Sequence, residues 1–476
     1  MKRLGKSISV IIALLIIVFS VLTVCGFSYY KGDFEQTVIR GLEDVDRGID
    51  IGGGAKVILG VPNAASGDEA PQISTDVLHD TAQVIEDRAA KFGLKDYEVY
   101  VNRAQQTVSL VVPNDVDCEY SAAEVASYLT TYGDLTLRGG SSYTDASIDS
   151  SNSQKFTNPT EDSLQIILGT DNVSEVQWFK DTSEGTETYW VSVLYDETGL
   201  VTLANATSPD TGYYYGGTVS IWLDNVMLSM QQVEEANTYG EFTFTNEGMT
   251  QQKAKLFTAI IDTGVLPTAD LSVVSVQSVA PSVGNDSGNI VLFAGLAALV
   301  AIAVIMIIRY RLSGVVSVFA MVLQCAVLLA FITGFLVDGG IMMSVAGMAG
   351  LAVSVLLTVF SSGLIAEKIR TELRHGSVMG NAVTVGIKDS RNTILDMSVV
   401  LAVISLVGLF LFGTSGLSIA IFGGSVVSGV YNFCIVLFIG AIANCITGYF
   451  VPQLMLRSLY SFSCLSKPSL FGGAKK

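Results

Sequence analysis

The feature that most constrains this chain is a set of six long apolar runs. The first covers residues 8–27, and the others cover residues 290–308, 315–337, 341–366, 394–412 and 419–446. An α-helix of about 20 apolar residues spans the hydrocarbon core of a bilayer. Half of the 476 residues are hydrophobic and only 15% are charged, whereas soluble domains carry about 25% charged residues. We therefore expect a polytopic α-helical membrane protein with six transmembrane helices.

The connections between these runs predict the orientation of the chain. Lys and Arg residues precede the first run and follow the second, fourth and sixth, whereas the connections at residues 338–340 and 413–416 carry none. Because Lys and Arg favour the cytoplasmic side, both termini should be cytoplasmic in a multi-pass protein of the cell (plasma) membrane. The first run should be an uncleaved signal anchor, and the alternative is a lipoprotein signal ending at Cys25.

A large acidic domain should lie outside the cytoplasm, between the first and second helices. Residues 28–289 hold about 39 of the 44 acidic side chains but only about 13 of the 27 basic ones. An acidic surface repels phosphate groups, so we expect no nucleic acid partner. The remaining parts are then the cytoplasmic N-terminus with the first helix (1–27), a five-helix transmembrane domain (290–450) and a cytoplasmic tail (451–476).

The pattern inside the acidic domain predicts a mixture of helices and strands. Apolar residues recur at helical spacing in 72–93, 121–132 and 251–262, and extended patterns occur in 97–112, 134–137, 190–195 and 219–223. This alternation indicates a compact α+β domain. Residues 139–188 are rich in Ser, Thr and Asp, and we expect them to form an inserted, loop-heavy lobe.

The residues that carry catalytic chemistry or metal binding form no recognisable group in this sequence. The six cysteines and two histidines show no metal-ligand spacing. Only Cys118 lies well inside the acidic domain, so no internal disulfide is expected there. There is no phosphate-binding loop and no nucleophile with its base. We therefore expect neither an enzyme nor a cofactor or metal site.

A series of short motifs along the chain resembles a known family. The helix with Arg88 is followed by Val112-Pro113-Asn114, and five further motifs are GIDIGGGA (48–55), VSIWLDNV (219–226), DTGVLP (262–267), VAPSVG (279–284) and RYRLSG (309–314). In order and spacing they resemble SecD, a membrane subunit of protein export related to the resistance-nodulation-division transporters. The family residues that we expect to be structural are Asp50, Gly53, Gly54, Gly264, Pro267 and Glu367.

The resemblance implies an accessory subunit of the Sec machinery that assists late translocation and release of secreted proteins. It implies as partners a SecF-like membrane subunit, the SecYEG channel with SecA, unfolded secreted polypeptides and membrane lipid. Two alternatives remain, a small-molecule or lipid exporter half-unit of the resistance-nodulation-division superfamily and an uncoupled scaffold paralogue. Exporters of that superfamily usually carry two sets of six helices, whereas this chain has one.

Several residues depart from the family pattern. Phe360 stands where the family has an intramembrane aspartate, Ser362 where it has asparagine, and Gly52 where it has arginine. Intramembrane carboxylates are costly and usually functional, so the change at Phe360 argues against dependence of this chain on the proton-motive force. Asp396 is then the proton-coupling candidate. The alternative for Asp396 is a carboxylate at a helix start, stabilised by the helix macrodipole.

Overall fold

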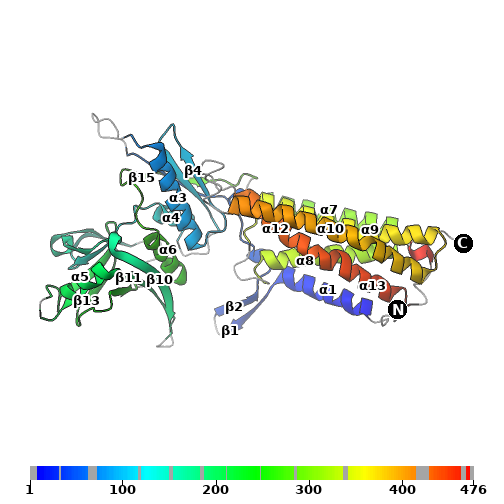
Figure 1. Cartoon of the computed structure of the whole chain (residues 1–476), viewed down its shortest axis with the longest axis horizontal. Coiled ribbons are helices and arrows are strands. Elements are labelled where there is room, and N and C mark those ends of the chain that lie inside the picture. Colours follow the sequence, from blue (N-terminus) through cyan, green and yellow to red (C-terminus); the bar gives the residue numbers. More distant parts are fainter. Residues whose placement is uncertain are drawn as a thin grey trace. The chain divides into compact units, whose positions relative to one another are not determined.

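The structure of the chain is a computed structural model (Figure 1). It describes residues 8–31, 34–62, 72–115, 120–148, 154–182, 187–210, 212–246, 248–283, 287–335, 341–413, 428–462 and 468–471. Cys118, residues 338–340 and residues 414–416 lie outside the described residues. The chain divides into two compact units. We call the first, residues 1–52, 280–414 and 427–476, the membrane unit, and the second, mainly residues 53–279, the intervening domain.

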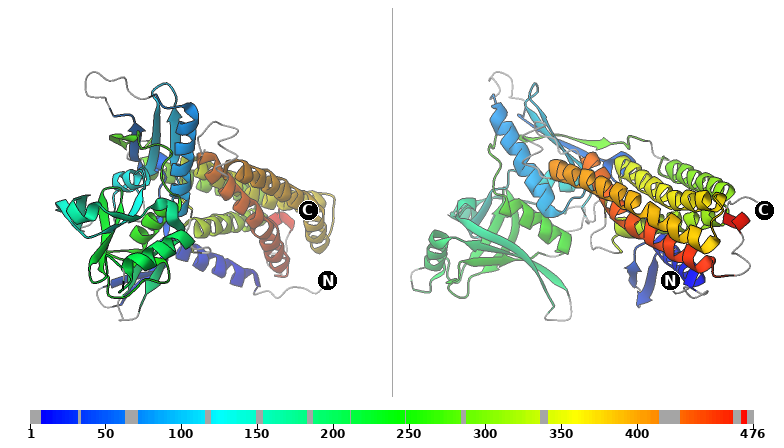
Figure 2. Two further views of the ribbon diagram at one scale, coloured as in Figure 1. Left: turned by 60° about the vertical axis from the view of Figure 1, so that its left-hand side comes forward. Right: turned by 45° about the vertical axis from the view of Figure 1, so that its right-hand side comes forward.

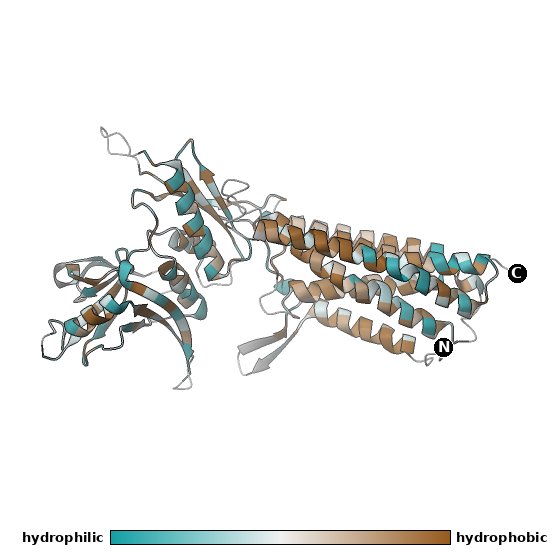
Figure 3. Cartoon of the chain, in the orientation of Figure 1, coloured by the Kyte–Doolittle hydropathy of each residue, from teal (hydrophilic) through white to brown (hydrophobic). Residues whose placement is uncertain are grey.

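The membrane unit confirms the prediction of six apolar helices. Among the described residues, six helical segments are long and apolar enough to cross a membrane. They are α1 (Ile8–Cys25), α7 (Ser287–Tyr310), α8 (Leu312–Ile332), α9 (Val345–Arg374), α10 (Met379–Gly413) and a last segment made of α12 (Ser428–Asn444), the π-helical turn η4 (Cys445–Phe450) and α13 (Val451–Leu459). Figure 3 shows that hydrophilic residues of this unit gather toward the end of the helices that lies near the C-terminus.

Several helices are longer than the apolar runs that predicted them. The helix α9 continues to Arg374, α10 begins at Met379, and the last helical segment continues to Leu459. Backbone hydrogen bonds do not end where side chains become polar, so charged turns extend a transmembrane helix into water. His375 caps α9, and Gly376, at φ +87°, follows before α10 begins.

Close backbone packing fixes the reversal between α7 and α8. Arg311 connects the two helices at φ +55°, a conformation that few residues other than glycine adopt. A side chain at Gly314 would place its Cβ 2.1 Å from the carbonyl oxygen of Met306, so glycine is required there. The helices α9, α10 and α12 then pack side by side (Figure 2). A two-stranded hairpin, β1 (Phe27–Lys31) with β2 (Phe34–Ile39), and the short helix α2 (Ile49–Gly52) follow α1.

The intervening domain begins with a four-stranded antiparallel sheet. Its strand order is β15-β3-β5-β4, formed by Ser272–Val279, Gly54–Gly60, Thr107–Pro113 and Glu98–Asn102. The helices α3 (Thr75–Phe92) and α4 (Ala122–Leu129) pack against it. Buried Val57, Ile85, Leu110 and Leu129 belong to the core between them. The sheet and helices confirm the α+β prediction.

Two further antiparallel sheets complete the intervening domain. The six-stranded sheet has the order β7-β8-β13-β12-β6-β9, formed by Tyr143–Ile148, Gln154–Pro159, Val226–Gln232, Thr218–Leu223, Leu135–Gly139 and Ile166–Leu168. The three-stranded sheet has the order β10-β11-β14, formed by Val173–Asp181, Thr188–Tyr195 and Glu241–Phe244. The helices α5 (Glu197–Thr207) and α6 (Gln251–Asp262) belong to the same region.

The prediction that residues 139–188 are mainly loop was wrong. Four strands, β7 to β10, lie within this range. Many of their side chains are exposed, so Ser and Thr occupy positions that would be apolar in a buried strand. Thr is also a good strand former because its β-branched side chain suits a pleated surface. Polar composition therefore concealed the strands.

Candidate functional site

The buried guanidinium of Arg88 is the centre of a polar junction in the intervening domain. Arg88 lies on α3, which begins where the Ser74 side chain accepts a hydrogen bond from the amide of Val77 and ends at Gly93, at φ +95°. The helix buries the face that carries Ile85, Arg88 and Ala89. Arg88 is 0% exposed. A charged side chain buried in this way requires several polar partners.

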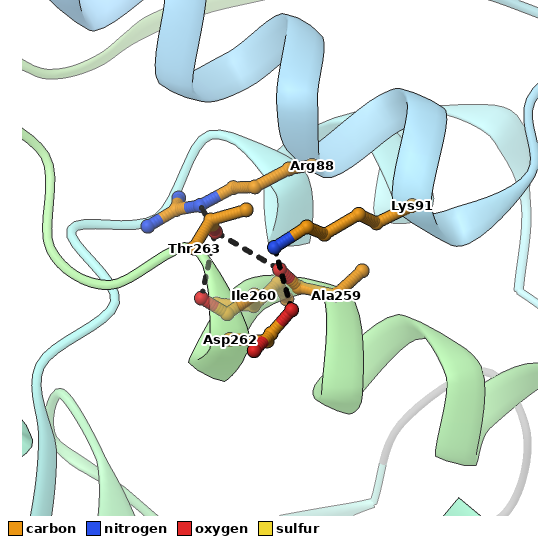
Figure 4. A network of polar contacts seen from close by, with 6 residues as sticks. All are labelled: Arg88, Lys91, Ala259, Ile260, Asp262 and Thr263. Atoms are coloured by element: carbon orange, nitrogen blue, oxygen red, sulfur yellow. Dashed lines mark hydrogen bonds and ion pairs between the residues drawn. The ribbon is translucent and has the colours of Figure 1, made fainter. Parts of the chain in front are cut away.

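Arg88 joins the C-terminal ends of α4 and α6. Its Nη1 donates to the carbonyl oxygens of Leu129 and Thr131 at 3.0 and 2.6 Å, and its Nη2 to those of Tyr132 and Gly264 at 3.1 and 2.7 Å. Its Nε donates to Thr263 Oγ1 at 3.1 Å (Figure 4). One guanidinium thus binds four carbonyls and one hydroxyl, including carbonyls that the helix ends leave without a partner.

At the same junction, the carboxylate of Asp224 binds backbone amides instead of carbonyls. It lies between β12 and β13 at φ +52°. Its Oδ1 accepts hydrogen bonds from the amides of Gly133 and Asp134 at 3.0 and 2.9 Å. Burial lowers the pKa of Arg88 to about 10, and the negative charge of Asp224 acts in the opposite direction. At this junction, therefore, the Arg88 cation donates to carbonyl oxygens and the Asp224 anion accepts from amides. Both groups bind the segment that follows α4.

Two glycines give the junction its close packing. Gly264 adopts φ +73° and presents its carbonyl to Arg88. Gly133 adopts φ +88°, and a Cβ there would lie 2.3 Å from Arg88 Nη2. Three of the sequence motifs, those that carry Arg88, Asp224 and Gly264, therefore meet at one place. Pro267 lies just beyond and is exposed. We call Arg88, Asp224, Gly133 and Gly264 the Arg88 junction.

The first glycine motif occupies two separate contacts. In the intervening domain, the carbonyl of Gly53 accepts from the amide of Asn114 at 3.0 Å, and a Cβ at Gly54 would lie 2.3 Å from the carbonyl oxygen of Val112. In the membrane unit, the carbonyl of Asp50 accepts from Ser282 Oγ at 3.2 Å. The motifs GIDIGGGA, Val112-Pro113-Asn114 and VAPSVG therefore act as backbone junctions.

The membrane unit contains a second polar group that the sequence interpretation missed. Asn444 Oδ1 accepts from Thr358 Oγ1 at 2.9 Å, and its Nδ2 donates to Ser361 Oγ and Ser398 Oγ at 3.0 and 2.9 Å. Thr447 Oγ1 donates to Gln324 Oε1 at 2.6 Å. We call these six side chains, Gln324, Thr358, Ser361, Ser398, Asn444 and Thr447, the Asn444 network.

The Asn444 network links α8, α9 and α10 to the last helical segment. Its members are at most 2% exposed, and none of them is ionisable. Polar side chains of this kind hydrogen-bond across membrane helices and hold them together. A π turn begins directly after Asn444, and such turns occur frequently at functional sites. The spacing of Ser354, Thr358 and Ser361 on one face of α9 was the sequence signal that could have revealed the network.

The predicted ionisable residues of the membrane unit lie apart from this network. Phe360 is 61% exposed, on the outer surface of the membrane unit, whereas Ser361 and Ser362 are buried. Asp396 is exposed on α10. The prediction that it is a helix-start carboxylate was wrong, because α10 begins at Met379. Glu367 Oε2 lies 3.7 Å from Arg309 and 3.7 Å from Arg370. Among the described residues, no group of three or more His, Cys, Asp or Glu side chains could hold a metal ion.

Comparison with known proteins gives several relatives of this chain. No protein-family model matches it. Protein translocase subunit SecD of Thermobaculum terrenum is 32% identical over 258 residues, which cover 54% of this chain and 46% of that protein. Protein translocase subunit SecD of Acidaminococcus fermentans is 23% identical over 431 residues, covering 90% of this chain and 89% of that protein. The matched part thus spans less than half of the first relative.

A solved structure shares the fold. The crystal structure of SecDF in its Super-membrane-facing form matches 95% of this chain and 57% of the SecDF chain, with a TM-score of 0.56 and 18% identity. A likeness at this identity concerns the fold alone. The Acidaminococcus fermentans relative and the SecDF structure each match at least 90% of the chain, and the sequence motifs occupy defined backbone junctions. The chain is therefore similar to SecD proteins along most of its length.

Proposed function

We propose that this chain is an accessory subunit of the Sec protein-export machinery that assists late translocation and release of secreted proteins. The observation that carries the proposal is the match of 95% of the chain to the SecDF fold. The name of its relatives, protein translocase subunit SecD, supports the same function. The Arg88 junction and the Asn444 network are suited to holding helices in place rather than to catalysing a reaction.

The exposed surface of the membrane helices supports a SecF-like membrane subunit as partner. The helices α7 and α10 leave most of their surface uncovered by the rest of this chain, with 6% and 17% of their spans buried. Further partners in this proposal are the SecYEG channel with SecA, unfolded secreted polypeptides and membrane lipid.

The proposed orientation places both termini in the cytoplasm and the intervening domain outside. Arg309 and Arg370, each 3.7 Å from Glu367 near the ends of α7 and α9, support this orientation, because Lys and Arg favour the cytoplasmic side. Thiol labelling in a cysteine-free background tests the orientation. Ser147→Cys should react with an impermeant reagent in intact cells, and His375→Cys should react only after lysis.

The proposed energy source is the partner rather than this chain. The Asn444 network is neutral, and the residue at the family's aspartate position, Phe360, lies on the outer surface. Asp396 remains the proton-coupling candidate of this chain, but the hydrogen bonds of the network described above do not involve it. Any dependence on the proton gradient would then enter through ionisable residues of the SecF-like subunit.

Depletion of the chain from its own cells tests the function. Pulse-labelled secreted proteins should persist at the membrane in depleted cells and be released after re-expression of the wild-type chain. A chain with Arg88→Met, which removes the central cation of the junction, should restore release poorly. Normal release kinetics in depleted cells would contradict the proposal.

One observation favours the alternative of a small-molecule exporter half-unit. The intervening domain has a hollow of about 330 Å³, lined in part by Leu203, Val219 and Phe242 together with Glu234 and Glu235. This volume lies at the lower end of ligand pockets, which measure about 300–1,000 Å³. Two results together would support this alternative over protein export. Cells that contain the chain would expel a lipophilic cation faster, and depletion of the chain would leave the release of secreted proteins unchanged.

A further inference from the structure

Glu86 is a buried carboxyl group to which the proposed function assigns no role. It lies on α3, two residues before Arg88, and is 0% exposed. Neither of its carboxylate oxygens has a hydrogen-bond partner among the described residues. An ionised carboxylate without hydrogen bonds is far less stable inside a protein than in water. The site therefore favours the protonated, neutral form of Glu86 over its carboxylate anion.

We propose that Glu86 makes the packing of α3 dependent on pH, so that ionisation of this acid loosens the C-terminal half of α3 and, with it, the Arg88 junction. The proposal does not rest on the role in export. It concerns the intervening domain of this chain alone.

The causes of the raised pKa of Glu86, burial and Asp87, include no cation among the described residues. On α3 its neighbours are Asp87 and Arg88, and the guanidinium of Arg88 is occupied by carbonyls and Thr263. The helix α3 packs against β4, β5, α4 and α6. The strand β5, with sequence TVSLVVP, carries no titratable side chain. The titratable or charged side chains on the other three elements and on the segment before β4 are Lys95, Asp96, Tyr97, Glu98, Tyr100, Glu124, Tyr128, Lys253, Lys255 and Asp262.

Asp87 and Tyr97 interact electrostatically with Glu86. Burial first, and then the charge of Asp87, raises the pKa of Glu86 to about 8. Burial raises the pKa of Tyr97 above its ordinary value, and the charges of Glu86 and Asp87 add to that effect. The charge of Asp87 thus disfavours a second negative charge at this place. Arg88 has a pKa of about 10, so the junction still holds its cation while Glu86 ionises.

The sign of the pH effect follows from proton binding. In the unfolded chain Glu86 titrates near its ordinary value of 4.5, so it has released its proton at pH 6, whereas the folded domain retains it. Unfolding therefore releases a proton and becomes more favourable as the pH rises, until the folded acid also ionises near pH 8. Between these limits one proton changes the unfolding equilibrium constant about tenfold per pH unit.

Urea unfolding of the full chain in detergent tests this proposal. All three tryptophans, Trp178, Trp190 and Trp222, lie in the intervening domain, so tryptophan emission reports on that domain alone. From pH 6 to pH 8, the unfolding constant of the wild type should rise about fiftyfold more than that of Glu86→Gln, because half of the folded acid is ionised at pH 8. Asp80→Asn is the matched control, because Asp80 is exposed on the same helix, and it should keep the wild-type dependence.

Hydrogen exchange in α3 gives the local measurement. After correction for intrinsic rates, peptides from residues 75–92 should lose protection above pH 8 in the wild type and keep it in Glu86→Gln. If Glu86→Gln does not fold, Glu86→Leu takes its place with the same expectation. Equal pH dependence in the wild type and the neutral variants would overturn the proposal. A wild-type α3 that keeps its protection at pH 9 would also overturn it, whatever the variants do.

Discussion

Replacing Arg88 with methionine should destabilise the intervening domain more than any surface substitution on α3. Methionine approximates the length of the side chain but leaves the carbonyls of Leu129, Thr131, Tyr132 and Gly264 without their donor. It also leaves Asp224 without the nearby cation. The effect therefore combines lost hydrogen bonds with polar groups buried unpaired.

The magnitude follows from the hydrogen bonds of the junction. Hydrogen bonds to charged groups contribute about 1.5–3 kcal/mol each, and each buried acceptor left unpaired costs about 1–3 kcal/mol. Some carbonyls will regain water, so the sum is an upper bound. Removal of one member of a buried charged network typically costs about 3–5 kcal/mol. We expect a loss of about 4 kcal/mol, a large part of the stability of a domain. Arg88→Lys should lose less, because an ammonium group supplies three donors.

Urea unfolding followed by tryptophan emission measures this loss in the full chain. Lys91→Ala is the matched control, because Lys91 on α3 forms an exposed ion pair with Asp262 on α6, at 2.5 Å. Exposed pairs contribute about 0–1 kcal/mol. An Arg88→Met variant that loses no more stability than Lys91→Ala would refute the reasoning.

Three other substitutions give separate predictions. Gly54→Ala should cost about 1–3 kcal/mol in urea unfolding, because its Cβ meets a backbone carbonyl; Gly60→Ala, whose Cβ meets side chains, should cost less. Asn444→Ala should lower the melting temperature of the purified protein more than Asn432→Ala, because three hydrogen bonds, each worth about 1 kcal/mol, are lost. Asp396→Asn should leave most gradient-stimulated release intact; complete loss, with normal assembly, would make Asp396 the coupling residue.

The number and order of the membrane helices could be predicted because the bilayer demands long apolar segments. The residues at which these helices begin and end could not be predicted. Lys388, Asp389 and Arg391 lie inside α10 although they are charged, and they led to a predicted helix start near residue 394. The error changed the interpretation of Asp396, which lies well inside the helix and outside the reach of its N-terminal dipole.

The motifs showed which residues matter in the intervening domain but not how they meet. Arg88, Asp224 and Gly264 are far apart in the sequence, and their contacts depend on how the helices and sheets pack. From the sequence alone, a buried arginine cannot be distinguished from a surface arginine on an amphipathic helix. The role of Asn444 was likewise hidden, because a single amide in an apolar run gives no indication of its partners on two other helices, α9 and α10.

Release of a secreted protein in reconstituted vesicles tests the central claim most directly. Vesicles would contain SecYEG and SecA with no addition, with this chain alone, or with this chain and the six-helix subunit that co-purifies with it from native membranes. The account predicts that release of translocated protein accelerates only when both subunits are present. No acceleration by the pair, or full acceleration by this chain alone, would contradict a SecD-type half-unit.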